Sequence, residues 1–246
     1  MLVLGFDTTA STVSAALLRD GNLISQYSAS STTTHSTTLL PAIESLLQSA
    51  SLKVEDLDLI CCSAGPGSFT GVRIGCATAK GLAAPFSIPC VGVSSLEAMA
   101  SLFGELPSVI CPALNARRGN VYCALFVSDG NDCVRRITAD DLLSVPDLCG
   151  QISEKLCDEA LNGLPLYIVG DFINGITQEA EKSGISVTAP PSLLTNPSGY
   201  GAALAGIREY TNSGCDRKLF TEARLAPIYL RKSQAEREKE ERNQCK

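Results

Sequence analysis

A glycine- and proline-rich turn between a buried strand and a helix carries the clearest chemical pattern in the sequence. Residues 57–62 are almost entirely apolar, as in a strand covered on both faces, and a Gly-Pro-Gly triplet follows at 65–67. Ser68 or Thr70 can cap the next helix, whose first backbone N–H groups could then receive a phosphate. Because the turn lacks a P-loop lysine, the pattern fits a simple capped turn as well as a phosphate-binding loop.

The helix after this turn carries small residues at every fourth position. Gly71, Gly75, Ala79 and Ala83 share one face, which therefore presents almost no side chain. A glycine inside a helix costs about 1 kcal/mol relative to alanine. Close approach of another backbone would offset that cost, and the approaching backbone could belong to this chain or to a partner.

The inventory of reactive side chains excludes several classes of enzyme. His35 is the single histidine, so the chain cannot supply a histidine pair for a metal site or an H-E-x-x-H helix. No catalytic or metal-binding residue is therefore expected. The eleven cysteines lack paired spacing, and several occur singly in apolar segments, which favours buried thiols over disulfides or zinc ligands.

The composition predicts a protein that does not bind nucleic acid directly. The net charge is −6 and the isoelectric point is near 4.9, which opposes direct binding to a phosphate backbone. A chain of 246 residues that is 45% hydrophobic can bury a large core. Neither a signal peptide nor an apolar run of membrane-spanning length is evident, so we expect a cytoplasmic location.

The order of predicted elements occurs twice. Three strands and then alternating helices and strands fill residues 1–105, and a similar order fills 106–232, before a charged tail at 233–246. A capping box at Ser94 to Glu97 opens one helix, and 140–161 reads as a helix broken at Pro146. Pro41 places the cap of the helix at about 36–50 near Thr37 or Thr38. The sequence therefore predicts two α/β domains of β-β-β-α-β-α-β-α order, with mixed sheets and a cleft between them.

This duplicated order, with Gly5-Phe6-Asp7-Thr8-Thr9 closing the first strand, resembles the ribonuclease H-like fold of actin-like ATPases. The run from Ser63 to Gly75, S-A-G-P-G-S-F-T-G-V-R-I-G, is similar to the signature of the TsaB (YeaZ) family. Further similar landmarks are His35-Ser36 with Leu39-Leu40-Pro41, Ala116-Arg117-Arg118-Gly119 before Val121-Tyr122, and Pro227-Ile228-Tyr229-Leu230-Arg231. The sequence departs from the family pattern at Asn115, Asn120 and Phe172, which weakens any expected nucleotide contact in the second domain.

The resemblance implies a non-catalytic scaffold in the synthesis of threonylcarbamoyladenosine beside the tRNA anticodon. It implies pairing with the paralogue TsaD through the helices at about 36–50 and 69–84, with the ATPase TsaE joining the assembly. The sequence leaves open whether a homodimer forms when TsaD is absent. Contact with tRNA would be indirect. The residues expected at the partner interface are Leu39, Ile43, Gly71, Val72, Gly75, Cys76 and Ala79.

The resemblance also raises the prospect of a degenerate site for ATP or ADP, formed by Asp7, Thr8, Thr9, Gly65 and Gly67. One alternative is an actin-like ATPase or kinase that acts alone, with Asp7 and the Gly-Pro-Gly turn contacting metal-bound water and phosphate. Another is TsaD itself or a protease, which the missing histidine pair disfavours. Turnover by the isolated chain would distinguish these alternatives from a scaffold.

Overall fold

In the first sheet, three neighbouring strands are buried on both faces, whereas the strand at one edge is largely exposed. The computed structural model describes residues 1–30 and 34–231, and the predicted tail at 233–246 lies outside them. The sheet has the strand order β3-β2-β1-β4-β5, with β4 and β5 parallel to β1, and β2 and β3 forming an antiparallel meander. Its strands are β1 (Leu2–Asp7), β2 (Thr12–Arg19), β3 (Asn22–Ser30), β4 (Leu59–Gly65) and β5 (Cys90–Ser94).

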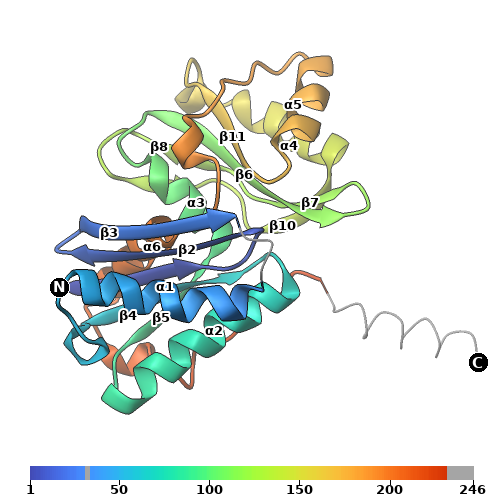
Figure 1. The fold of residues 1–246 in the computed structure, drawn as a ribbon. Helices are drawn as coiled ribbons and strands as arrows, with labels where there is room; N and C mark the ends of the chain where they lie inside the picture. The colour runs from blue at the N-terminus through green and yellow to red at the C-terminus, as the bar shows by residue number, and fades with distance from the viewer. Residues whose placement is uncertain (31–33, 232–246) are drawn as a thin grey trace, which may run out of the picture.

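Helices cover both faces of this sheet, which explains why β1 and β4 carry apolar residues on both sides. Helices α1 (His35–Ser49) and α2 (Phe69–Ala83) pack on one face around Phe6, Leu17 and Ile60. Helix α6 (Gly199–Asn212) packs on the other face. Figure 1 shows α1 and α2 side by side on the side of the sheet away from the second half of the chain.

The second sheet is built around β6 (Ser108–Arg117). Strand β11 (Leu166–Gly170) pairs with it in parallel on one side, while β7 (Asn120–Cys123) and β8 (Phe126–Ser128) pair antiparallel with its two ends. β7 and β8 therefore act as one interrupted strand. β10 (Asp141–Ser144) and β9 (Val134–Arg136) pair with them in turn and form a second interrupted strand.

With these interruptions allowed for, the second sheet repeats the strand order of the first. Thr188 makes an isolated parallel bridge to Tyr167 of β11, at the place that β5 occupies in the first sheet. Helices α4 (Val145–Leu156) and α5 (Ile173–Lys182) contribute to one apolar cluster with this sheet. The predicted duplicated α/β fold with mixed sheets is confirmed.

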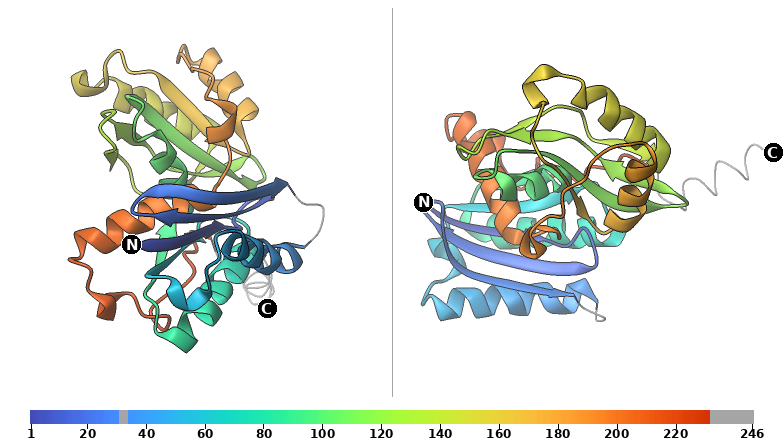
Figure 2. Two further views of the ribbon diagram at one scale, coloured as in Figure 1. Left: turned by 60° about the vertical axis from the view of Figure 1, so that its left-hand side comes forward. Right: turned by 90° about the horizontal axis from the view of Figure 1, so that it is seen from above.

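The last helix returns to the first half of the chain (Figure 2). A Cβ atom on Gly5 would lie 2.3 Å from the Gly199 carbonyl oxygen, so α6 and β1 approach as closely as two backbones can. Helix α3 (Ser95–Ala100) packs between α6 and β6 and joins the halves. The predicted boundary near residue 105 stays a prediction, and the chain beyond Ser198 shares its core with residues 1–94.

An ion cluster also links the two halves. Arg136 of β9 and Arg208 of α6 donate to the two carboxylate oxygens of Glu97 on α3, at 2.9 and 2.7 Å. Arg136 also pairs with Asp140. Burial alone would raise the pKa of Glu97, but the hydrogen bonds from the two arginines outweigh it and hold the pKa below its ordinary value.

Three local predictions about helix starts need correction. Ser94 caps α3 by accepting from the Glu97 N–H, but the Glu97 carboxylate bonds to the two arginines, so only half of the expected capping box forms. Residues 141–144 form β10 rather than a helix, because Ser144 caps α4 and Pro146 lies in its first turn. Helix α1 begins at His35, not at Thr37 or Thr38, and Pro41 lies inside it.

Short 3-10 turns complete the described chain, at Val54–Asp56, Ala84–Phe86, Ser101–Phe103, Glu159–Leu161, Ser192–Leu194 and Arg217–Leu219. No helix in residues 1–30 and 34–231 combines the length and the apolar content needed to cross a membrane.

Candidate functional site

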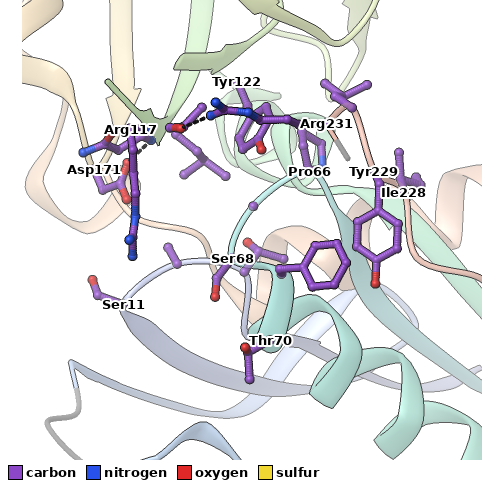
Figure 3. Close-up of a pocket in the computed structure, with 18 of the residues that line it drawn as sticks. Ser11, Pro66, Ser68, Thr70, Arg117, Tyr122, Asp171, Ile228, Tyr229 and Arg231 are labelled. Atoms are coloured by element: carbon purple, nitrogen blue, oxygen red, sulfur yellow. Dashed lines mark hydrogen bonds between the residues drawn. The ribbon is translucent and has the colours of Figure 1, made fainter. Parts of the chain in front are cut away.

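A cavity of about 660 Å³ lies where the two halves face each other. Its walls come from the loop after β1, the N-terminal end of α2, the β6–β7 hairpin and the last described residues of the chain (Figure 3). The lining residues fall in four segments, 9–11, 66–70, 114–117 and 228–231, together with His35, Tyr122 and Asp171.

The last of these segments joins the two halves. Together with the three residues before it, it is called the C-terminal strap here, residues 225–231. The Ile228 N–H donates to the Ala64 carbonyl at 2.7 Å, which fixes the strap to the end of β4 in the first half. Arg231 donates to the Ala116 carbonyl at 3.0 Å, which fixes it to β6 in the second half. Figure 3 shows Arg231 reaching toward the β6–β7 hairpin. The strap therefore forms part of the cavity wall and links the two halves there.

The backbone of the Gly-Pro-Gly turn lies very close to two other backbone segments, the strap and the loop after β1. Gly65 has a φ of 111°, and a Cβ atom there would lie 2.4 Å from the Ile228 carbonyl oxygen of the strap. A Cβ atom on Gly67 would lie 2.6 Å from the Thr9 carbonyl oxygen. Ser68 caps α2 as predicted, accepting from the Gly71 N–H at 3.3 Å.

The polar residues at the end of β1 are buried, and most of their side-chain polar atoms form hydrogen bonds within the chain. Asp7 accepts from the Thr9 N–H and hydroxyl at 2.8 and 2.9 Å, and its other carboxylate oxygen has no hydrogen-bond partner among the described residues. Burial raises the pKa of Asp7, and the nearby Ser63 hydroxyl and the hydrogen bonds from Thr9 only partly oppose this. The Thr8 hydroxyl donates to the Gly71 carbonyl at 2.7 Å.

The five residues predicted to contact a nucleotide thus fall into two groups, those that line the cavity and those that do not. Thr9 and Gly67 line the cavity, whereas Asp7, Thr8 and Gly65 do not. The nucleotide contact stays a prediction, and in this structure it could involve Thr9 and Gly67 directly. A position at a strand end did not place the Asp7 carboxylate on the cavity surface.

The cavity combines hydroxyl groups with charged groups. Ser11, Ser68 and Tyr122 border it, as do the side chains of Arg117 and Asp171. Such a site can bind a polar or anionic ligand, because hydroxyl and guanidinium groups donate hydrogen bonds and α2 points its N-terminal end at the cavity.

Two of the family departures have structural roles at or near this cavity. The Asn115 side chain accepts from the Arg117 N–H at 2.7 Å and stabilises the turn of the hairpin, while the Asn115 N–H donates to Asp171 at 2.7 Å. Phe172 immediately precedes α5 and packs against Gly175.

The lone histidine is engaged in a structural contact. A His35 ring nitrogen lies 2.8 Å from the Ala10 carbonyl oxygen and ties the start of α1 to the loop after β1. Within residues 1–30 and 34–231, no three or more histidine, cysteine, aspartate or glutamate side chains are grouped so that they could hold a metal ion.

The small-residue face of α2 makes contacts inside this chain. A Cβ atom on Gly71 would lie 1.9 Å from the Thr8 carbonyl oxygen, and one on Gly75 would lie 2.8 Å from the Thr8 hydroxyl. The seven residues predicted at a partner interface are all buried within this chain, so their role in binding a partner stays a prediction: Leu39, Ile43, Gly71, Val72, Gly75, Cys76 and Ala79.

The opposite sides of the same two helices are exposed and form what is called the helix-pair face here. Leu40 of α1 is 50% exposed, and a Cβ atom on Gly81 of α2 would meet nothing within 4 Å. Small and apolar residues are therefore among the exposed ones on this face. Its members are Leu40, Pro41, Glu44, Gln48, Arg73, Ala77, Gly81 and Ala84.

Comparisons with known proteins agree with this architecture. A family model described as TsaD, tRNA N6-adenosine threonylcarbamoyltransferase, matches residues 22–197. The tRNA threonylcarbamoyladenosine biosynthesis protein TsaB of Haemophilus influenzae is 30% identical over 240 residues, covering 94% of each chain. TsaB of Bacillus subtilis is 37% identical over 155 residues, which cover 63% of this chain and 67% of that protein.

Solved structures show the same fold. YeaZ from Pseudomonas aeruginosa superposes with a TM-score of 0.74 at 22% identity, covering 93% of this chain and 99% of that one. A ROK hexokinase from Thermus thermophilus superposes with a TM-score of 0.51 at 12% identity, covering 85% and 99%.

Two ribonuclease H-like halves facing each other across a cavity define the actin-like ATPase class of fold. Within that class, the chain belongs to the TsaB (YeaZ) family, one branch of the wider family that the TsaD model describes.

Proposed function

We propose that this chain is a non-catalytic scaffold subunit that binds a TsaD-related paralogue in the synthesis of threonylcarbamoyladenosine on tRNA. Membership of the TsaB family supports the pathway, since the relatives of that name are described as tRNA threonylcarbamoyladenosine biosynthesis proteins. The observation that carries the scaffold role is the exposed helix-pair face, which residues 1–30 and 34–231 leave uncovered.

The helix-pair face is suited to receive another pair of helices. Ala77 and Gly81 follow one another at helical spacing on exposed α2, so a partner helix could approach its backbone closely. Leu40 would supply an apolar contact beside them. A second copy of this chain could occupy the same face when the paralogue is absent.

A scaffold role is consistent with the contact of the single histidine and with the net charge of the chain. His35 is held by a backbone carbonyl, and the acidic net charge of −6 disfavours direct contact with tRNA, which the partner would bind. We further propose that TsaE joins the assembly in the cytoplasm and that the cavity between the halves is where ATP or ADP would bind in the complex.

Reconstitution tests the proposal. The purified chain, a TsaD paralogue and the other components of the pathway are mixed with tRNA, and modified adenosine is measured with and without this chain. We expect formation of a complex with the paralogue, modification that requires both proteins, and no turnover by this chain alone. ATPase, kinase, peptidase or tRNA-modifying turnover by the chain free of its paralogue would contradict a scaffold role.

A further inference from the structure

An arginine in the first turns of α2 contacts two aromatic rings that stack on each other and come from distant segments of the chain. The rings of Phe69 on α2 and Tyr229 on the C-terminal strap stack with centroids 4.4 Å apart and planes inclined by 19°. The Arg73 guanidinium carbon lies 4.1 Å from the centroid of the Phe69 ring, and its Nε donates to the Tyr229 hydroxyl at 2.9 Å. Phe69, Arg73 and Tyr229 are called the aromatic–arginine stack here.

This arrangement orders Arg73 without neutralising it. Within the described part of the chain, no carboxylate lies within ion-pair distance of the Arg73 guanidinium, which contacts Tyr229 through its Nε and the Phe69 ring through its flat face. Its two terminal nitrogens therefore remain available as a planar pair of donors, which matches the geometry of a carboxylate. Arg73 is exposed, and Tyr229 is 42% exposed.

The stack is continuous with the helix-pair face. Arg73 precedes Ala77 by four residues, so both side chains project from the same side of α2. A partner that covers Ala77 would then reach the Arg73 donors. Because arginine and tyrosine with ordered side chains contribute strongly to protein interfaces, the stack has the composition of an energetic centre.

We propose that Arg73, oriented by Phe69 and Tyr229, binds a surface carboxylate of the TsaD-related partner. This inference rests on the proposed function and adds the residue of this chain that recognises an acidic group on the partner. The stack also makes the C-terminal strap part of the docking surface, although the strap is far from α2 in the sequence.

The affinity of the paralogue for Arg73→Gln tests this proposal. We expect binding to weaken by about 10- to 100-fold, with an unchanged melting temperature, and the salt dependence of the dissociation constant to become shallower. Arg73→Lys should recover only part of the loss, because lysine keeps the charge but not the planar pair of donors. Tyr229→Phe keeps the ring but removes the acceptor of the Nε bond, and should weaken binding by about 3- to 10-fold.

Arg135→Gln is the matched control, since it removes an exposed arginine from β9 in the second half of the chain. Equal affinities for wild type, Arg73→Gln and Arg135→Gln would overturn the role of Arg73 while leaving the proposed function intact. A wild-type chain that does not bind the paralogue would overturn both. A loss of self-association in Arg73→Gln, with unchanged binding of the paralogue, would assign the stack to a homodimer instead and overturn the proposed partner.

Discussion

Gly71 of α2 lies against Thr8 of the loop after β1, in a contact that only glycine can make. A Cβ atom on Gly71 would be 1.9 Å from the Thr8 carbonyl oxygen, and the Thr8 hydroxyl donates to the Gly71 carbonyl at 2.7 Å. One residue pair thus joins the start of the cavity loop to the first turn of α2. The small face of α2 is explained by this internal contact.

Gly71→Ala should therefore destabilise the isolated chain. The added methyl group must displace backbone, and overpacking of this kind costs about 1–3 kcal/mol. For a chain of this size each kcal/mol lowers the melting temperature by roughly 2–4 °C. Gly81→Ala on the exposed side of the same helix is the control, and should raise stability by up to about 1 kcal/mol because alanine favours the helix. Equal melting temperatures for the two variants would refute the internal assignment.

Asp7→Asn should stabilise the chain at neutral pH. Burial raises the folded-state pKa of Asp7 above the ordinary value of 3.8, so ionisation destabilises the folded state as the pH rises through the folded pKa. Asparagine carries no charge, so the variant should need more urea to unfold than the wild type at pH 7. The gain should vanish below about pH 3.8, where wild-type Asp7 is protonated in both states. Urea unfolding at both pH values measures it, and a variant less stable at pH 7 would contradict the prediction.

Glu97→Gln should have the opposite effect at neutral pH. The folded-state pKa of Glu97 is lowered, so its contribution to stability is present above the ordinary value of 4.5 and is lost as the pH falls through the folded pKa. Loss of the charged partner of Arg136 and Arg208 should cost about 1–3 kcal/mol at pH 7 and less at pH 3.5. Glu105→Gln, at an exposed position, should change stability by less than about 0.5 kcal/mol. A pH-independent loss would show that the ion cluster is not its cause.

The sequence predicted the fold well because its strands are strongly patterned. Alternation and buried runs identified β1, β4 and β6. The Gly-Pro-Gly turn, with Ser68 or Thr70 as the predicted cap, indicated the start of α2. Residues 141–144 were missed because their strand is short and partly exposed, and pairs only with β7. The pairing of a short strand with another strand leaves no periodic pattern in its own residues, so the sequence could not predict it.

The candidate site was harder to predict because its contacts are distant in sequence. Arg73 and Tyr229 are separated by 156 residues, and Arg231 reaches Ala116 across 115. The motif containing Tyr229 and Arg231 was recognised as a landmark, but no local pattern indicates what it packs against.

The two faces of α2 illustrate a further limit. Small residues recur on both faces, at 71, 75, 79 and 83 and again at 77, 81 and 84. Spacing alone does not tell which set meets the sheet. Burial in the structure assigns the first set to the core and the second to the surface.

The most direct test of the scaffold account is the affinity of a TsaD paralogue for Ala77→Arg. Ala77 lies at the centre of the exposed side of α2, so a large charged side chain there should obstruct a partner without disturbing the core. The account predicts binding weakened by about a hundredfold or more, an unchanged melting temperature, and a matching loss of tRNA modification. Ala160→Arg, an exposed position in the second half, should leave all three unchanged. Full affinity of Ala77→Arg for the paralogue would contradict the account.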